Sequence, residues 1–143
     1  MFLGEYQHSL DPKSRIIIPS RHREELGERF VATKGLDDCI FIYPLEEWAS
    51  IGAKLRNLPL TQGKARSFVR FFLAGAAELE LDKQGRTVLP LHLREYAGMD
   101  KDVVIIGVGS RIEIWAHDKW TRYNEMAGSN FEEIAESLVD IGI

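Results

Sequence analysis

The chain of 143 residues is 45% hydrophobic and 28% charged, which is typical of a soluble globular protein and excludes a disordered or fibrous one. Its formal net charge of −4 does not exclude a polyanionic partner, because such partners respond to the local potential. The charge is unevenly distributed: residues 51–77 contain five bases and no acid, whereas residues 124–143 contain five acids and no base.

The N-terminal segment "MFLGEYQHSL" lacks the basic and apolar regions of a secretory signal. No apolar run approaches the roughly 20 residues that span a bilayer. We therefore expect a cytoplasmic protein without a membrane partner. Cys39 is the only cysteine and lies in the apolar run "CIFIY", so we expect a buried, reduced thiol without a catalytic role.

In chain order, the first distinctive feature is the polar break "DPKSR" at residues 11–15, between two strand-like runs. Such a break is typical of a hairpin turn. The run that follows, "RIIIP" at residues 15–19, is continuously apolar after its arginine. This pattern predicts a strand buried on both faces that ends at Pro19.

The next elements are predicted from caps, apolar periodicity and β-branched content. Ser20 is the expected N-cap of the first helix and Gly27 its end, while the last helix is expected to begin near Thr61. The elements are a helix at 20–26, strands at 29–33 and 39–43, and helices at 44–58 and 61–75.

The second half repeats this order and adds helices at its end. Its predicted elements are strands at 77–81 and 86–89, a helix at 91–98, strands at 102–108 and 111–116, and helices at 117–128 and 130–141. "GVGS" at residues 107–110 is predicted to be a hairpin turn. The last helix places Phe131, Ile134 and Leu138 on one face, and we expect that face to dock on its own protein.

The two halves are related by a repeat with an offset of 71 residues. "LDPKSRIIIP" at residues 10–19 returns as "LDKQGRTVLP" at residues 81–90, with Leu, Asp, Arg and Pro at identical spacing. We expect two similar units and two helical additions. They are a first unit at 1–50, a helical connector at 51–76, a second unit at 77–123 and an acidic C-terminal helix at 124–143.

The repeated segment has the chemistry of a tight turn. Asp11 and Asp82 can each accept a hydrogen bond from the backbone N–H two residues on. Gly85 supplies a position of positive φ, and Ser14 occupies the equivalent site.

Four basic side chains lie at or beside the two turns: Lys13, Arg15, Lys83 and Arg86. Each arginine could fold back onto its own aspartate as a turn-stabilising ion pair, or it could project toward a polyanion. Residue chemistry leaves both readings open.

The segments "MFLGEYQHSLDPKSRIIIPSRHRE" and "LDKQGRTVLPLHLRE" resemble the two signature segments of the MraZ family of bacterial transcriptional regulators, and the resemblance runs over essentially the whole chain. It implies an α+β fold in which two tandem AbrB-like (SpoVT-AbrB) swapped-hairpin units form a pseudo-two-fold β-barrel core with flanking helices. The family commonly has glycine where this chain has Ser14.

The resemblance also implies a function. Members of the family form ring-shaped homo-oligomers that bind direct repeats in the promoter of the division and cell wall gene cluster, usually to repress it. The D-x-x-x-R segments are the DNA-contacting elements of the family. This implies that Asp11–Arg15 and Asp82–Arg86 contact double-stranded DNA in a cytoplasmic, nucleoid-associated protein.

Three alternatives were weighed against DNA binding. The four histidines His8, His22, His92 and His117 have no metal-ligand spacing, and we expect neither a metal nor a cofactor. Catalysis by Asp11 and Asp82 is disfavoured because neighbouring Lys and Arg would hold both carboxylates ionised. An antitoxin-like protein-interaction module of the same fold is the remaining alternative.

Overall fold

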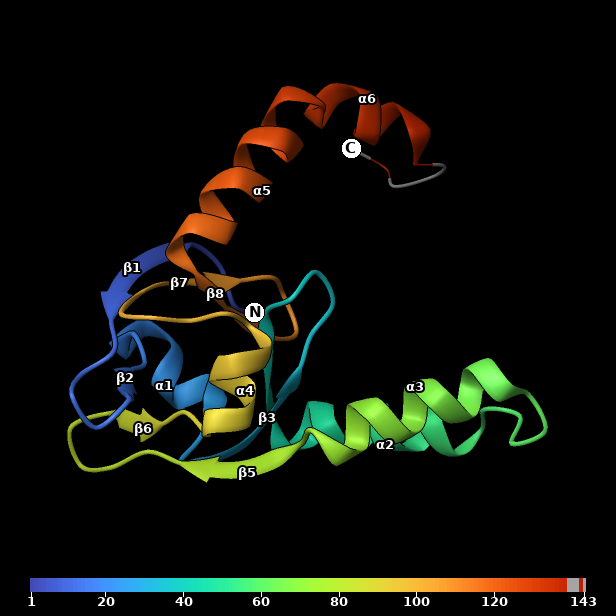
Figure 1. Cartoon of the computed structure of the whole chain (residues 1–143), viewed down its shortest axis with the longest axis horizontal. Coiled ribbons are helices and arrows are strands. Elements are labelled where there is room, and N and C mark those ends of the chain that lie inside the picture. The colour runs from blue at the N-terminus through green and yellow to red at the C-terminus, as the bar shows by residue number, and fades with distance from the viewer. Residues whose placement is uncertain (139–141, 143) are drawn as a thin grey trace.

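A computed structural model of the chain describes residues 1–138 and 142 (Figure 1). Within these residues the architecture is mixed α+β. The strands are β1 (Glu5–Ser9), β2 (Arg15–Ile17), β3 (Arg29–Lys34), β4 (Ile40–Pro44), β5 (Ala77–Glu80), β6 (Arg86–Val88), β7 (Asp102–Gly107) and β8 (Ile112–Ala116). The helices are α1 (Ser20–Leu26), α2 (Leu45–Arg56), α3 (Gly63–Ala74), α4 (Leu91–Tyr96), α5 (His117–Ser129) and α6 (Phe131–Ser137).

The two halves of the chain are interleaved by strand pairing. Six strands form one antiparallel sheet in the order β1-β7-β8-β4-β3-β5, and β2 pairs with β6 in a separate two-stranded ribbon. The hairpins β3–β4 and β7–β8 each lie within one half, but every other pairing joins the first half to the second. Exchanging equivalent strands of the two halves reproduces the same pairings, so neither half contains all the partners of its own strands.

Two expectations about strand pairing are wrong. No hairpin forms around the first D-x-x-x-R segment, because β1 and β2 leave its turn toward different partners, β7 and β6. The six-stranded sheet also does not close into a barrel by hydrogen bonding in the described residues, because β1 and β5 are its two edges. Turn chemistry specifies the local backbone but does not select the partner of each flanking strand.

The two faces of the sheet are covered by different elements. On one face, α1, α4 and the β2–β6 ribbon enclose a large apolar cluster that includes Phe2, Phe30 and Leu93. On the other face, residues of α2, α3 and α5 pack over Phe41 and Trp115. The central strands are therefore apolar at almost every position, because successive side chains enter the two clusters alternately.

The β2–β6 ribbon is buried on one face only, so the expectation of burial on both faces is wrong. Ile16 and Ile18 are buried, whereas the intervening Ile17 is 43% exposed. On the partner strand Val88 is 52% exposed, and the adjacent Leu89 is buried. The ribbon therefore lies over the core and presents a second, outward face that includes exposed aliphatic side chains.

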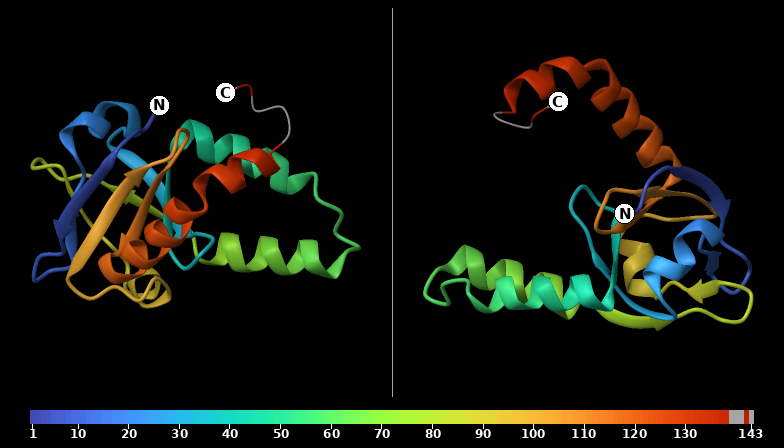
Figure 2. Two further views of the ribbon diagram at one scale, coloured as in Figure 1. Left: turned by 90° about the horizontal axis from the view of Figure 1, so that it is seen from above. Right: turned by 180° about the vertical axis from the view of Figure 1, so that it is seen from behind.

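Two helical arms project from the sheet, as Figure 2 shows from above and from behind. One arm is the pair α2 and α3, and the other is α5 followed by α6. The expectation that the last helix docks on its own protein is wrong for the described residues, because Phe131 is 71% exposed. That helix was predicted to run to residue 141, and residues 139–141 lie outside the described residues.

Local details test several other expectations. Ser20 does not cap α1, since Pro19 is at the N-cap position without a side-chain hydrogen bond. Gly27 ends α1 as predicted, with φ 82° and its N–H donating to the carbonyl of Arg23. Cys39 is buried as predicted, and burial raises the pKa of its thiol far above the ordinary value. None of the described helices has the length and apolar content needed to cross a membrane.

The one-sided burial of the ribbon predicts different effects for neighbouring substitutions in β2. Ile16→Ala should lower the free energy of unfolding by about 2–5 kcal/mol, because it leaves a cavity in the core. Ile17→Ala should change it by only about 0.5 kcal/mol, because the side chain is partly in solvent. Urea unfolding of both variants measures the difference, and equal losses would contradict the one-sided arrangement.

Candidate nucleic-acid interface

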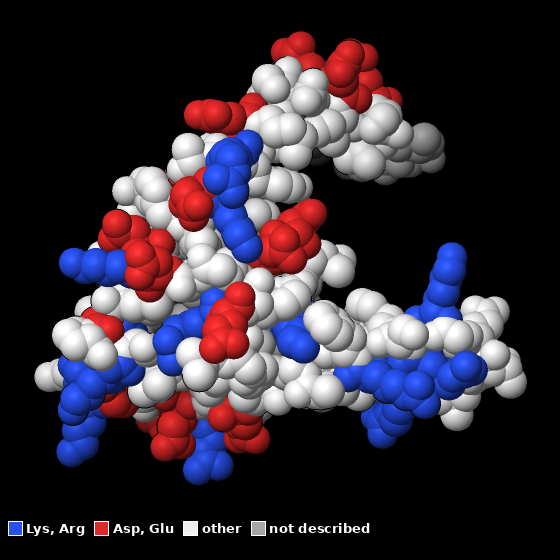
Figure 3. Space-filling view, viewed as in Figure 1, with Lys and Arg blue, Asp and Glu red and all other residues white. Residues whose placement is uncertain are grey.

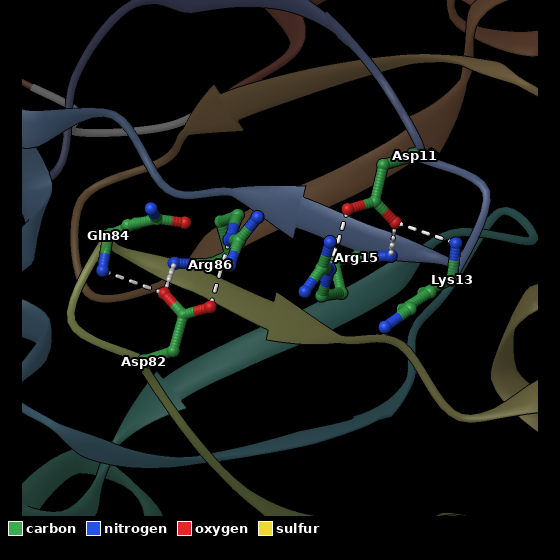
Figure 4. A network of polar contacts seen from close by, with 6 residues as sticks. All are labelled: Asp11, Lys13, Arg15, Asp82, Gln84 and Arg86. Atoms are coloured by element: carbon green, nitrogen blue, oxygen red, sulfur yellow. Dashed lines mark hydrogen bonds and ion pairs between the residues drawn. The ribbon is translucent and has the colours of Figure 1, made fainter.

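The first turn is organised by the carboxylate of Asp11 (Figure 4). Its Oδ1 accepts hydrogen bonds from the backbone N–H groups of Lys13 and Arg15, both at 2.9 Å. Its Oδ2 accepts a hydrogen bond from Nε of Arg15 at 2.6 Å. The backbone closes the same turn, because the N–H of Ser14 donates to the carbonyl of Asp11 and the N–H of Asp11 donates to the carbonyl of Arg15. The turn is therefore hydrogen-bonded along its whole length.

The second turn repeats this geometry contact by contact. Oδ1 of Asp82 accepts hydrogen bonds from the N–H groups of Gln84 and Arg86, both at 2.9 Å, and Oδ2 accepts one from Nε of Arg86 at 2.8 Å. The predicted hydrogen bond to the N–H two residues on is thus present in both copies. The proline at position 12 and the lysine at position 83 have different side chains and do not alter the turn, because the turn is made by the backbone and the aspartate.

These hydrogen bonds stabilise the ionised carboxylates. The backbone N–H of Arg15 is the main cause that lowers the pKa of Asp11, and the Arg15 side chain and the N–H of Lys13 lower it further. The N–H of Arg86 plays the same part in lowering the pKa of Asp82. A carboxylate held ionised in this way is poorly suited to act as a general acid near neutral pH.

Both arginines fold back onto their own aspartates, but only through Nε. The Arg15 and Arg86 side chains are 25% and 26% exposed. Among the described residues, no hydrogen-bond partner is found for the Nη groups of either guanidinium. The ion pair and the outward donor are therefore compatible: the pair orients the guanidinium while its Nη groups stay available.

The register of the ribbon brings the two arginines to one face. Arg15 lies opposite Val88, and Ile17 lies opposite Arg86. Because cross-strand partners share a face and alternate residues along a strand share a face, these four side chains all lie on the outer side of the ribbon. We call this set, Arg15, Ile17, Arg86 and Val88, the outer ribbon face. Lys13 and Lys83 are exposed at the turn tips beside it.

Each turn is anchored to a strand of the other half. The carbonyl of Ser14 accepts a hydrogen bond from the N–H of Leu89 at 3.0 Å, and the carbonyl of Gly85 accepts one from Ile18 at 2.9 Å. Both donors belong to buried residues. The turn tips are therefore fixed to the core, and the separation of the two arginines is set by the ribbon.

The two turns differ at their positions of positive φ. Ser14 has φ 60° and Gly85 has φ 78°, so both copies adopt the left-handed conformation, at a cost for the serine. At Gly85 a Cβ atom would lie 2.2 Å from Cζ of Arg23, which reaches the turn from α1. Glycine is therefore required at position 85 for steric as well as conformational reasons.

Arg23 and Arg94 support the ribbon and were not identified as site residues from the sequence. Nε of Arg23 donates to the carbonyl of Ile18 at 2.8 Å, and Nε of Arg94 donates to that of Leu89 at 2.9 Å. Their exact recurrence at the repeat offset of 71 was the one available signal. Each arginine binds the residue that follows its ribbon strand, so each helix is linked to the strand before it.

The remaining candidate residues do not join this site. His22 is buried against the rings of Phe2 and Tyr6, and burial lowers its pKa. His92 lies within hydrogen-bonding distance of the carbonyl of Gly75. In the part of the chain that the structure describes, no three His, Cys, Asp or Glu side chains are placed to hold a metal ion.

The contact between Gly85 and Arg23 predicts the effect of adding one methyl group. Gly85→Ala should lower the free energy of unfolding by about 1–2 kcal/mol through its left-handed backbone, and more through displacement of Arg23. In an Arg23→Ala background the loss should shrink to the backbone part. Ser14→Ala is the matched control, because that position already holds a Cβ, and it should change stability by about 0.5 kcal/mol at most. Equal losses for Gly85→Ala in both backgrounds would exclude the steric contact.

The lowered pKa of Asp82 predicts a pH dependence. A carboxyl group whose pKa is lower in the folded than in the unfolded state stabilises the fold above its unfolded value, ordinarily 3.8, and loses that contribution as the pH falls through the folded pKa. The stability difference between the unaltered protein and Asp82→Asn should therefore be constant from pH 8 to about pH 5 and shrink below the ordinary value. Chemical unfolding at each pH measures it, with Asp100→Asn as the exposed control. A difference that grows toward low pH would contradict the assignment.

Comparison with known proteins places the chain in one family. A family model described as "MraZ protein, putative antitoxin-like" matches it twice, over residues 1–71 and residues 72–141. A protein of Syntrophomonas wolfei named "Transcriptional regulator MraZ" is 69% identical over 143 residues, which cover both chains completely. Proteins with the same name from Heliobacterium modesticaldum and Pelotomaculum thermopropionicum are 57% and 60% identical over 143 residues, covering all of this chain and 100% and 99% of theirs. Two matches that together span nearly the whole length, and identities this high over complete chains, establish that the chain belongs to the MraZ family.

Proposed function

We propose that the protein is a transcriptional regulator that binds double-stranded promoter DNA through the outer ribbon face. The observation that supports this most directly is the presence of two arginines, one from each half, on a single exposed face with their Nη groups unpaired among the described residues. The shared name of the full-length relatives supports the regulatory role. The resemblance of the D-x-x-x-R segments to DNA-contacting elements supports the choice of surface.

The dimensions of the ribbon suit the major groove, which admits a two-stranded β-ribbon. Arg15 and Arg86 are separated by two residues along the ribbon, or about 7 Å, which corresponds to about two base-pair steps. The planar Nη edge of arginine can donate two hydrogen bonds to a guanine edge or to a phosphate. The exposed Ile17 and Val88 side chains offer apolar contacts for thymine methyl groups.

The aspartates contribute indirectly to this recognition. Asp11 and Asp82 hold the guanidinium groups through Nε before DNA arrives. An oriented side chain loses less rotamer freedom on binding, so more of the hydrogen-bond energy appears as affinity. Lys13 and Lys83, at the flexible ends of long side chains, are suited to phosphate contacts that do not depend on sequence.

The proposal includes assembly into a ring-shaped homo-oligomer that binds direct repeats. One subunit offers few contacts, and a ring that presents several ribbons to successive repeats raises the effective concentration of each. The family resemblance supports the promoter of the division and cell wall gene cluster as the target. It also supports repression, through occupation of the promoter by a nucleoid-associated protein.

The proposal also includes the swapped-hairpin arrangement of two AbrB-like units, at residues 1–50 and 77–123, around the connector at 51–76. The exchange of β1 and β5 between the halves supports it, because each of these strands pairs with a strand of the other unit. The acidic helix at 124–143 then lies outside both units.

An antitoxin-like protein-interaction module is the second candidate. The printed description of the family includes the words "putative antitoxin-like", and the exposed apolar face of α6 is a feature that a partner protein could cover. In that case the outer ribbon face would not govern DNA affinity. The following experiment therefore separates the two candidates.

Arg15→Ala and Arg86→Ala should each weaken binding to the promoter repeats upstream of the protein's own gene by about 5- to 150-fold, which corresponds to about 1–3 kcal/mol per bidentate contact. The double variant should lose more than either single variant. Fluorescence anisotropy with labelled promoter DNA measures the affinities.

Arg122→Ala, which changes an exposed arginine on α5, serves as the control and should bind as the unaltered protein does. Affinity should fall with salt by about 0.9 log units per log unit for each neutralised phosphate. A double variant with unchanged affinity would refute the site, and a flat salt response would favour the protein-interaction module.

A further inference from the structure

The two helical arms present surfaces that the ribbon does not use. Between α2 and α3 lies a groove of about 370 Å³. It is open to solvent, and its lining is mostly apolar. The apolar residues that line it include Leu55, Leu58, Leu60, Val69 and Leu73. We call this the basic groove because Arg56, Arg66 and Arg70 also line it.

The basic groove has no acidic counterpart on its own arm. The segment from 51 to 77 contains Lys54, Arg56, Lys64, Arg66 and Arg70 and no acid. All five side chains are exposed, and none forms an ion pair with an acid in the described part of the chain. Figure 3 shows this arm as a continuous basic projection. Five like charges around exposed apolar residues favour an acidic, partly apolar partner.

The other arm has the complementary composition. Four exposed glutamates, Glu125, Glu132, Glu133 and Glu136, lie on the end of α5 and on α6, without an ion pair in the described residues. Phe131, Ile134 and Leu138 are exposed at a spacing of three and four residues. Such a spacing is typical of a helix that lies in an apolar groove. Figure 3 shows acidic residues gathered at the tip of this arm, which we call the acidic helix.

Charge complementarity identifies the occupant as a second copy of the chain. The acidic helix and the basic groove are opposite in charge, and both expose aliphatic or aromatic side chains. They stand apart within one chain in all the views of Figure 1 and Figure 2, so one copy does not satisfy its own groove. Every further copy supplies both surfaces at equal concentration.

We propose that the acidic helix of one copy docks in the basic groove of the next. The contact joins two different surfaces, so each pair retains one free groove and one free helix, and the contact propagates until a ring closes. This inference rests on the homo-oligomer of the proposed function and names its interface. The outer ribbon face takes no part in the contact.

Two full-length variants test the interface. Leu60→Asp/Arg70→Glu alters exposed residues of the groove and leaves the acidic helix intact. Phe131→Asp/Ile134→Asp alters exposed residues of the helix and leaves the groove intact. All four side chains are solvent-exposed, so both variants should retain the circular dichroism spectrum of the unaltered protein.

Sedimentation velocity without DNA then measures assembly. The unaltered protein should form oligomers, and each variant alone should sediment as a monomer. An equimolar mixture should form a dimer, because one intact groove meets one intact helix and growth stops there. A variant that assembles alone as the unaltered protein does, or a mixture that stays monomeric, would overturn the proposal.

The same variants distinguish this inference from the proposed function. Arg15→Ala/Arg86→Ala should assemble as the unaltered protein does while losing DNA affinity. The monomeric variants should bind a single repeat normally and several repeats at least about 100-fold more weakly than the unaltered protein. Normal assembly of the groove and helix variants, together with loss of DNA binding in the arginine variant, would reject the interface and leave DNA binding supported.

Discussion

Every strand outside the two local hairpins needs a partner from the other half of the chain, and this constraint determines the rest of the structure. β1 pairs with β7, β5 with β3, and β2 with β6. The crossing produces one sheet with two apolar clusters, so the central strands are buried on both faces. It also produces the ribbon, to which each half contributes one strand and one arginine. The candidate site therefore exists only when both halves are folded together.

The aspartate of each turn reconciles two requirements that the sequence left as alternatives. One carboxylate accepts two backbone hydrogen bonds and a third from the arginine of the same turn. Using Nε for the ion pair leaves the Nη groups at the outer ribbon face. A stable turn and an outward donor are thus properties of a single arrangement. The anchoring of Ser14 and Gly85 to buried strands makes that arrangement stiff.

The molecule separates its charges by arm, which reconciles an acidic protein with a DNA-binding role. The net charge of −4 results from basic helices on one arm and acidic helices on another. The outer ribbon face lies on neither arm, so assembly and DNA contact need not compete for the same side chains. In the proposed ring, the arms supply the assembly and each ribbon supplies a weak contact that the assembly multiplies.

The sequence alone was sufficient for the short-range features: every predicted strand and helix has a counterpart within a few residues, and Ser14 and Gly85 have the expected positive φ. These features depend on neighbours in the chain, through turn hydrogen bonds, caps and side-chain periodicity. Only the tertiary structure decided that β1 and β2 pair with separate strands, that Ile17 faces solvent, and that α6 leaves its apolar face exposed. The partner of a strand and the burial of a side chain depend on residues tens of positions away, and local patterns hold no record of which surfaces those residues will cover.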